Sequence, residues 1–450
     1  MSSQTGSPSL PDISKSTELY ERAKNLIPTG TMLLSKRPER IAPGRWPAYY
    51  KRAWGCQVED IDGNVFVDFT GDVGATMLGR ADPDVNAAVH AVVDQGSFCT
   101  LNYPREVELA ELLTRIIPCA QQYRRVLGGG EADMVAVRIA RGYTKRDKVA
   151  FCGYHGWHDW YLAANLADDS VLDEHLLPGL KPRGVPRPLV NTAMPFNYND
   201  LDALKDILES NTGQVAAIIM EATRHYRPNK GFLEGVRQLA DQHGAVLIFD
   251  EVVTGFRMAL GGAQEYFGVT PDLAVFAKTI SNGYPMGAVV GRRDVMNTVN
   301  EQFISSTYWT DAVGTAAALA TIEKMRRIGV VEYIWDLGKE LSAGLSEALE
   351  KAGIKGNILG WPSHPILSLT GHDGEVGGAM ATFFVRGQLA RGYLTTGTHF
   401  LTAAHTKDDI HKYLMAAEET FKELKASMDR GTVMEDIDNS PGQSLFKRLA

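Results

Sequence analysis

Short apolar runs alternate with amphipathic segments through the middle of the chain. Runs of strand length recur from about Gly71 onward, and between them apolar residues recur at helical spacing, as in Val107–Ile116 and Leu233–Leu239. Strands that alternate with helices build parallel sheets with both faces covered, so the pattern predicts an α/β fold. The predicted strands are Val126–Leu127, Val149–Cys152, Val215–Met220, Ala245–Phe249, Leu273–Phe276 and Ala288–Gly291.

The two ends of the chain have different patterns. Residues 1–14 are rich in Ser, Pro and Gly and predict a disordered N-terminus, which a helix at Glu18–Leu26 follows. Alternation around Asp62-Gly63 predicts a β-hairpin in Cys56–Phe69. A long helix at Ala312–Arg327 precedes a mixed pattern. We expect domain segments at 15–70 (N-terminal part of the small domain), 71–325 (large domain) and 326–430 (C-terminal small domain), with a tail at 431–450.

Composition excludes several classes of protein. The 450 residues are 44% hydrophobic, enough for a large core, and the formal net charge of -8 without a basic run argues against nucleic-acid binding. No apolar stretch reaches the roughly 20 residues that span a bilayer, and no signal-peptide pattern precedes the fold, so we expect a soluble, cytoplasmic protein. Four dispersed cysteines predict reduced core residues rather than disulfides or a zinc site: Cys56, Cys99, Cys119 and Cys152.

Two predicted strands end in residues suited to chemistry. Lys278 follows the apolar run Leu273–Ala277 and precedes a small, polar turn, and Asp250 follows the run Ala245–Phe249. Ligands bind at the carboxyl ends of strands in open α/β sheets. A lysine that becomes neutral can form a Schiff base with pyridoxal phosphate, and a carboxylate can keep the pyridine nitrogen of that cofactor protonated. The alternatives are a solvated lysine and a helix-capping carboxylate.

The segments around these two residues resemble one family closely. LIFDEVVTGFR (Leu247–Arg257) and PDLAVFAKTISNGYPMGAVVGRR (Pro271–Arg293) resemble the class III (subgroup II, fold-type I) aminotransferases, and among them the glutamate-1-semialdehyde 2,1-aminomutase branch, over about residues 18–424. The resemblance implies a large domain with a mostly parallel sheet flanked by helices, and a smaller α+β domain built from both chain ends. It also implies pyridoxal 5'-phosphate as cofactor and pyridoxamine 5'-phosphate as intermediate.

Cofactor-binding residues carry over from the family motifs. The resemblance implies that Lys278 forms the internal aldimine, that Asp250 bonds the pyridine nitrogen, and that Val252 packs on one face of the ring. The motif at Tyr154, His155 and Gly156 implies an aromatic residue on the other face, with a core tyrosine as the alternative. Glu221, which begins the segment EATRHYRPNKGF, is a further implied cofactor contact.

One departure from the family concerns the phosphate. Where relatives carry Ser-Gly-Thr, this chain has Gly128, Gly129 and Gly130 before a helix predicted at Ala132–Tyr143. Glycines allow close backbone approach, and a helix N-terminus binds phosphate through N–H groups, so we expect a phosphate cup with a somewhat weaker grip on the cofactor. A flexible loop is the alternative for a Gly-Gly-Gly run on its own.

A second subunit is implied by the segment SSTYWTD (Ser305–Asp311). Thr307 matches the threonine that reaches the phosphate of the neighbouring subunit in this family, which implies a homodimer with shared active sites. Tyr308, Trp309 and Asp311 stand where relatives are commonly small. They predict a bulky polar acceptor, such as a keto-sugar or cyclic ketone, contacted by Trp309. Packing at the dimer interface is the alternative.

Other charged positions are candidates for substrate binding. Arg224 and His225 occupy the place of the usual proline after Glu221 and could hold a carboxylated or hydroxylated substrate. Lys36 and Arg37 lie near the position of a carboxylate-binding arginine in aminomutase relatives. For all four residues the alternative is a solvated surface position.

The resemblance leaves the reaction type open. The main hypothesis is intermolecular transfer of an amino group from an amino-acid donor, L-glutamate being our first choice, to a polar oxo acceptor in biosynthesis, with Lys278 as the proton carrier. The stretch Tyr393–Thr406 has no acidic residue, whereas aminomutases carry a glutamate nearby, which counts against glutamate-1-semialdehyde as substrate. An aminomutase, another carbanion reaction such as decarboxylation or racemisation, and an inactive relative are the alternatives.

Overall fold

The computed structural model describes residues 9–168, 170–172, 181–369 and 376–442. The described chain divides into two compact units. The large unit comprises residues 74–76 and 83–331, and the small unit comprises residues 9–73, 77–82 and 332–442, so it is assembled from both ends of the chain. The expected disorder at residues 1–8 falls outside the described residues. Within 9–14, Ile13 is buried and Ser14 begins helix α1.

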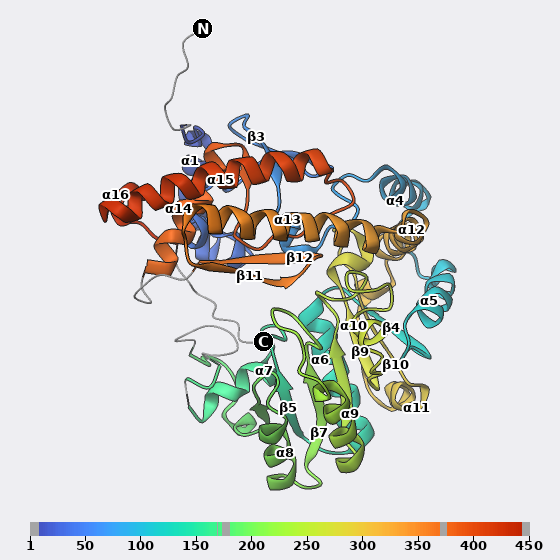
Figure 1. Ribbon diagram of the computed structural model, residues 1–450. Coiled ribbons are helices and arrows are strands. Elements are labelled where there is room, and N and C mark those ends of the chain that lie inside the picture. The colour runs from blue at the N-terminus through green and yellow to red at the C-terminus, as the bar shows by residue number, and fades with distance from the viewer. Residues whose placement is uncertain (1–8, 169, 173–180, 370–375, 443–450) are drawn as a thin grey trace. The chain divides into compact units, whose positions relative to one another are not determined.

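The described part of the large unit is built on a seven-stranded sheet with the order β4-β10-β9-β8-β7-β5-β6 (Figure 1). Strands β5 to β9 pair in parallel, while β10 runs antiparallel to both of its neighbours, β9 and β4. The prediction of a largely parallel sheet is therefore confirmed. The strands are β4 (Gln122–Val126), β5 (Lys148–Cys152), β6 (Ala193–Pro195), β7 (Val215–Met220), β8 (Val246–Asp250), β9 (Leu273–Phe276) and β10 (Gly287–Gly291).

Every residue of β7, β8, β9 and β10 is buried, which requires cover on both faces of the sheet. Helix α6 packs across β7 to β10, and α9 packs against β7 and β8. Helix α6 begins at Gly129, three residues before its predicted start, because the N–H of Ala132 already bonds to the Gly128 carbonyl. The helices of this unit are α4 (Pro83–Gln95), α5 (Arg105–Ile116), α6 (Gly129–Thr144), α7 (Asp159–Leu162), α8 (Leu201–Ser210), α9 (Phe232–His243), α10 (Ala263–Phe267), α11 (Arg293–Met296) and α12 (Ala312–Ile328).

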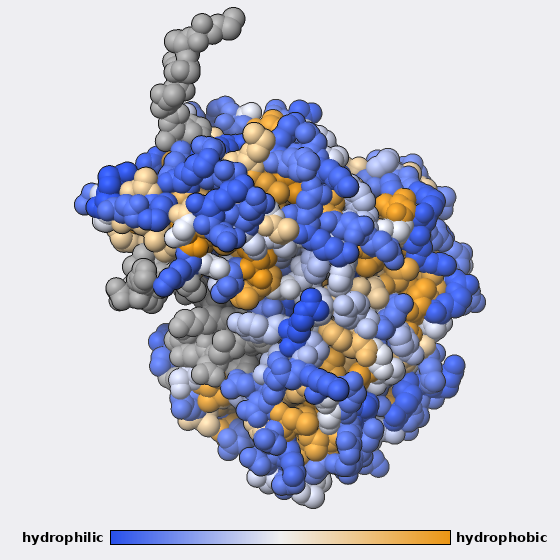
Figure 2. Space-filling model, in the orientation of Figure 1, coloured by the Kyte–Doolittle hydropathy of each residue, from blue (hydrophilic) through white to orange (hydrophobic). Residues whose placement is uncertain are grey.

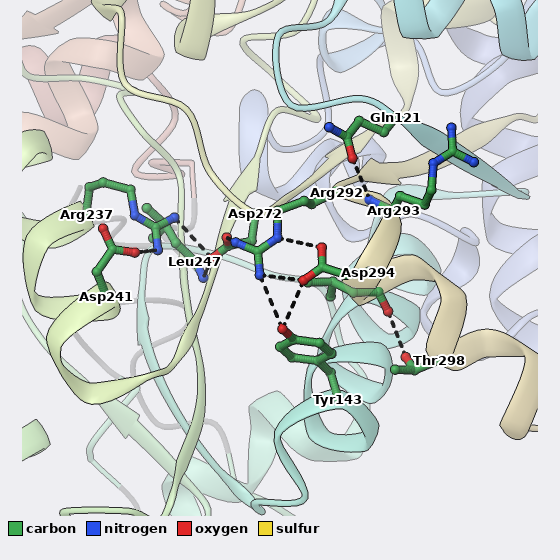
Figure 3. Close-up of polar contacts among 11 residues, drawn as sticks. Gln121, Tyr143, Arg237, Asp241, Leu247, Asp272, Arg292, Arg293, Asp294 and Thr298 are labelled. Atoms are coloured by element: carbon green, nitrogen blue, oxygen red, sulfur yellow. Dashed lines mark hydrogen bonds and ion pairs between the residues drawn. The ribbon is translucent and has the colours of Figure 1, made fainter.

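An ion-pair network fastens the sheet at the amino ends of β8 and β9 (Figure 3). The buried Asp272 precedes β9, and its carboxylate accepts hydrogen bonds from the backbone N–H of Leu247 (2.8 Å), from Arg237 of α9 (3.0 Å) and from Arg292 after β10 (2.7 Å). The hydroxyl of Tyr143 in α6 lies in the same network. A buried carboxylate with several charge-assisted donors holds neighbouring elements firmly. This edge of the sheet is structural.

The opposite edge of the sheet gathers the residues expected to carry chemistry. The strand register pairs Cys152 with Met220, Met220 with Phe249, and Asp250 with Val275. The residues that directly follow β5, β7, β8 and β9 are thereby brought to one edge, as expected for ligand sites in parallel sheets.

The small unit combines segments from the two ends of the chain. Its four-stranded sheet has the order β1-β2-β3-β13, in which β2 and β3 form the predicted hairpin and β13 adds in parallel to β3. A separate antiparallel pair joins β11 and β12. The elements are α1 (Ser14–Leu26), α2 (Pro38–Ile41), β1 (Tyr50–Trp54), β2 (Gln57–Asp60), β3 (Val65–Asp68), α3 (Gly71–Gly74), α13 (Val330–Ala352), β11 (Gly356–Trp361), β12 (His364–Leu369), α14 (Val376–Ala390), β13 (Tyr393–Leu394), α15 (Lys407–Arg430) and α16 (Val433–Asp436).

The surface in view is mainly hydrophilic, with separate hydrophobic patches (Figure 2). Among the described helices, none combines the length and apolarity needed to cross a membrane.

All four cysteines are unpaired, and Cys56, Cys119 and Cys152 are buried as predicted. The prediction was wrong for Cys99, which is exposed because it lies in the connection between α4 and α5 rather than in a strand or helix of the core.

Candidate active site

Lys278 lies two residues beyond the end of β9 and begins a single 3₁₀ turn, Lys278–Ser281. Its backbone has φ of +48°, a left-handed conformation that costs a residue with a side chain about 1 kcal/mol or more and that clusters at functional sites. The hydroxyl of Thr279 donates to the carbonyl of Gly255 (2.9 Å) and holds this turn in place. Burial, aided by the positive charge of Arg224, lowers the pKa of Lys278 to about 8, despite opposing effects of Glu221 and Asp250.

Asp250 ends β8 and pairs with a buried histidine. Its Oδ2 lies 2.9 Å from Nδ1 of His155, and its Oδ1 accepts the backbone N–H of Val252 at 3.0 Å. The other ring nitrogen of His155 lies 3.0 Å from the carbonyl oxygen of Cys152. A carbonyl and a carboxylate only accept hydrogen bonds, so both ring nitrogens of His155 face acceptors. A histidine that is completely buried then faces the negative charge of Asp250.

Glu221 follows β7 and forms a second buried acid–base pair. Nη1 of Arg224 donates to both carboxylate oxygens of Glu221, at 2.9 and 3.2 Å, and both side chains are almost fully buried. The backbone N–H of Tyr154 also donates to Glu221 (3.3 Å). Gly153 has φ of +105°, and a Cβ there would lie 2.8 Å from Glu221 Oε2, so glycine permits this close approach.

The half-buried Tyr154 belongs to the turn that follows β5. Its ring packs edge-on against Tyr161, with 6.1 Å between centroids, and Tyr161 in turn donates to the Gly153 carbonyl at 2.8 Å. Tyr154 also packs against the large core cluster. The turn is thereby fixed beside the Asp250–His155 pair.

The three predicted glycines stand at the N-terminus of α6. Gly128 is the residue before the helix, and Gly129 and Gly130 are its first two residues. A Cβ on Gly129 would lie 3.0 Å from both methyl carbons of Val252, so the cup and Val252 lie side by side. The first N–H groups of a helix lack intrahelical acceptors, which makes such an end suitable for a phosphate.

Trp309 lies far from the glycine cup in the sequence but contacts Glu131, the residue that follows the three glycines. Its indole N–H donates to Oε1 of Glu131 at 3.2 Å, while Oε2 of Glu131 accepts the backbone N–H of Leu127 at 2.7 Å. Asp311, the residue before α12, accepts the N–H groups of Val313 and Gly314 and forms an ion pair with Arg125. Trp309 and Asp311 therefore both make contacts that stabilise the fold of the large unit. Thr307 is exposed.

The remaining substrate candidates have separate surroundings. His225 is partly buried, and burial together with Arg224 lowers its pKa to about 4, so it is neutral at physiological pH. In the small unit, Lys36 is exposed, and Arg37 lies 3.7 Å from the carboxylate of Glu39. Of these three, only His225 stands beside a residue that acts electrostatically on Lys278.

Asp133 in α6 is a site residue that was not predicted from the sequence. Its side chain is 2% exposed. One of its carboxylate oxygens lies within 4.8 Å of a ring nitrogen of His155 and of a carboxylate oxygen of Asp250. The overlooked signal was an acidic residue within the buried stripe of the predicted helix, beside Ala132, Ala136 and Val137.

Comparison with known proteins identifies the family. The family model for class III aminotransferases matches residues 41–361, more than half of the chain. The chain belongs to the class III aminotransferases. The resemblance drawn from the motifs around Asp250 and Lys278 is thereby confirmed, including the aminomutase branch among its relatives.

Relatives of this class III aminotransferase have more than one activity. It is 33% identical to 3-aminobutyryl-CoA aminotransferase of Cloacimonas acidaminovorans, over 92% of this chain and 98% of the relative. It is 35% identical to glutamate-1-semialdehyde 2,1-aminomutase of Geotalea daltonii, over 92% of this chain and the whole relative. The FumI protein of Sphingopyxis sp. MTA144, solved as its PLP internal aldimine, superposes with a TM-score of 0.83 at 25% identity and covers 92% of this chain and 97% of that one. The fold-type I prediction is confirmed.

The pH dependence of cofactor capture follows from the lowered pKa of Lys278, which is about 8. Only the neutral amine attacks an aldehyde, so we expect the rate at which the cofactor-free class III aminotransferase takes up pyridoxal phosphate to fall about tenfold per pH unit below that value. Stopped-flow absorbance between pH 6 and 10 measures this rate. A rate that keeps rising up to pH 10 would show that the folded protein does not lower this pKa.

Proposed function

We propose that this protein is an intermolecular aminotransferase that uses pyridoxal 5'-phosphate and moves an amino group from an amino-acid donor to a polar oxo acceptor. The observation that carries the proposal is the state of Lys278. Its amine has a pKa lowered to about 8 at the strand edge that also presents the Asp250–His155 and Glu221–Arg224 pairs. Schiff-base chemistry requires an amine whose pKa is close to physiological pH, and pyridoxal phosphate also requires a carboxylate near its ring nitrogen.

The residues present fit the cofactor. Gly128–Gly130 offer a helix N-terminus without side chains for the phosphate, Val252 lies against Gly129, and Asp250 would hold the ring nitrogen. When bound, the cofactor supplies an electron sink that acidifies the carbon next to the transferred nitrogen. Lys278 would then take a proton from one carbon and return it to another, because its chain is tethered at the site.

Arg224 is our proposed anchor for a substrate carboxylate. It is 7% exposed and already bonds a carboxylate, that of Glu221, through Nη1. A guanidinium group binds carboxylates with strong, directional hydrogen bonds. The neutral His225 beside it would contribute a hydrogen-bonding group rather than charge. An amino-acid donor such as L-glutamate supplies the carboxylate that this site would bind.

The acceptor is proposed to be a polar oxo compound such as a keto-sugar or cyclic ketone. Tyr308 supports this proposal, because it is 66% exposed, whereas Trp309 and Asp311 have framework contacts. A second candidate is an oxo compound whose product carries the amine at C3, as the name of the 33% identical 3-aminobutyryl-CoA aminotransferase indicates.

A homodimer with shared active sites is part of the proposal. Thr307 is exposed next to Tyr308, whose ring lies 6.0 Å from that of Phe98, itself 50% exposed. Exposed aromatic residues that lie together are common at interfaces between protein chains. We propose that Thr307 contacts the cofactor phosphate of the partner subunit across this surface.

The donor experiment tests the function directly. The cofactor-loaded protein is mixed with L-glutamate, L-alanine or 3-aminobutyrate without any acceptor, while the visible absorption of the bound cofactor is recorded. We expect one donor to remove this absorption and to release one equivalent of its oxo acid per site. Absorption that persists with every donor would overturn the proposal and favour an aminomutase, which would act on glutamate-1-semialdehyde without an external donor.

A double substitution tests Arg224 as the carboxylate anchor, with an alkylamine as the control substrate. Arg224→Gln alone would leave Glu221 buried without its cation, so Glu221→Gln is combined with it. We expect the double variant to lose roughly tenfold or more in apparent affinity for a donor with a carboxylate, and to keep its affinity for an alkylamine of similar size. An equal loss for both amines would show that Arg224 does not bind the carboxylate.

A further inference from the structure

Asp133 is a buried acid without a positive partner of its own. It lies in the first turns of α6 and is 2% exposed. Its Oδ1 has no hydrogen-bond partner, and among the described residues no ion pair includes Asp133. Burying an ionised carboxylate without a partner is far more costly than burying its neutral form. The structure therefore needs an explanation for an acid at this position.

Each of the two neighbouring acids already faces a nitrogen-bearing partner. Asp250 faces His155, whose ring nitrogens both contact hydrogen-bond acceptors, and Glu221 faces Arg224. An ionised Asp133 would add a third negative charge beside those of Asp250 and Glu221. Burial, together with the charges of Asp250 and Glu221, raises the pKa of Asp133 well above its usual range. Tyr154 also interacts electrostatically with Asp133.

We propose that Asp133 carries a proton at neutral pH and shares it with the Asp250–His155 pair, so that it governs how strongly Asp250 attracts the ring nitrogen of the cofactor. The geometric basis is that a carboxylate oxygen of Asp133, a ring nitrogen of His155 and a carboxylate oxygen of Asp250 all lie within 4.8 Å of one another. A neutral carboxyl has one O–H to donate, and donation to a carboxylate spreads the negative charge of that carboxylate. Asp133 is thus a positioning residue that acts through Asp250.

The role in catalysis rests on the proposed function, whereas the proton on Asp133 does not. Two substitutions distinguish the hydrogen bonding of Asp133 from its side-chain volume. Asp133→Asn keeps a neutral hydrogen-bond donor of the same shape, and Asp133→Val fills the same space without one. Thr144→Val, at the far end of α6, is the control for a general effect on this helix.

Infrared spectroscopy of the full-length protein without cofactor tests the proton first. With ¹³C-labelled aspartate at pH 7.5, we expect the wild-type spectrum to contain a protonated-carboxyl band that Asp133→Asn removes and Thr144→Val keeps. The difference between variants isolates Asp133 from other buried acids such as Asp68. If Asp133→Asn leaves the protonated-carboxyl region unchanged, Asp133 is ionised and the proposal fails, whatever reaction the enzyme catalyses.

A spectral pH titration of the cofactor-loaded enzyme tests the coupling to Asp250. We expect Asp133→Val to move the pH midpoint of the cofactor's absorption change by about one unit or more, and Asp133→Asn to move it less. A purely structural role would change the melting temperature but leave all midpoints equal, and that result would overturn the coupling. Because this measurement needs no substrate, failure of the proposed amino transfer would not alter it.

Discussion

Lys278→Ala is expected to abolish turnover. Burial lowers the pKa of Lys278 to about 8. Losing the proton carrier costs up to about 10⁴-fold on its own, and losing covalent attachment adds to this. The measurement is the rate of oxo-acid formation from the donor found above, at saturating donor and acceptor.

Two controls separate a catalytic loss from a folding defect. Lys278 has φ of +48°, and alanine at this position has the same backbone cost, so Lys278→Ala and Lys278→Arg should melt at similar temperatures. Both variants should still bind pyridoxal phosphate through the glycine cup, reversibly, as equilibrium dialysis would show. Residual turnover within tenfold of the wild type would exclude Lys278 as the essential amine.

Asp250→Asn is expected to have the second largest effect. The substitution keeps size and one of the two acceptor oxygens, but it removes the negative charge that faces His155 and, in the proposed function, the ring nitrogen. Loss of one preorganised charge of this kind costs about 10²–10³-fold in the chemical step. Single-turnover absorbance measurements of the half-reaction with the donor give this rate without a contribution from product release.

The neighbouring Glu251 provides a matched control. It is completely buried, and its carboxylate accepts the N–H groups of Ala263 (2.8 Å) and Gln264 (2.9 Å) at the start of α10. Glu251→Gln should therefore lower stability and leave the half-reaction rate close to that of the wild type, whereas Asp250→Asn should lower that rate. Equal rates in the two variants would remove the catalytic role of Asp250.

The contrast between Asp250 and Glu251 illustrates what lies beyond a sequence motif. The two acids are adjacent and both follow the apolar run Ala245–Phe249, so alternation alone points their side chains to opposite faces without indicating which face is catalytic. The sheet decides the matter, because Asp250 meets His155 from the end of β5 while Glu251 meets the start of α10.

Trp309 and Asp311 show the same limit for the substrate. Their bulk beside Thr307 suggested a specialised acceptor site, but Trp309 bonds Glu131, and Asp311 caps α12 and pairs with Arg125. The contacts with Glu131 and Arg125 join residues about 180 positions apart, which no local pattern can reveal. The contacts leave Tyr308 as the exposed aromatic residue of this segment.

The sequence by itself determined the alternating α/β architecture, the family and the positions of Lys278 and Asp250. It could do so because periodicity and strand-end chemistry are local properties of the chain. Only the tertiary structure revealed the Asp250–His155 and Glu221–Arg224 contacts and the buried Asp133 between acids. Burial and charge pairing depend on which distant strands become neighbours, and they set the protonation of the groups that would do the chemistry.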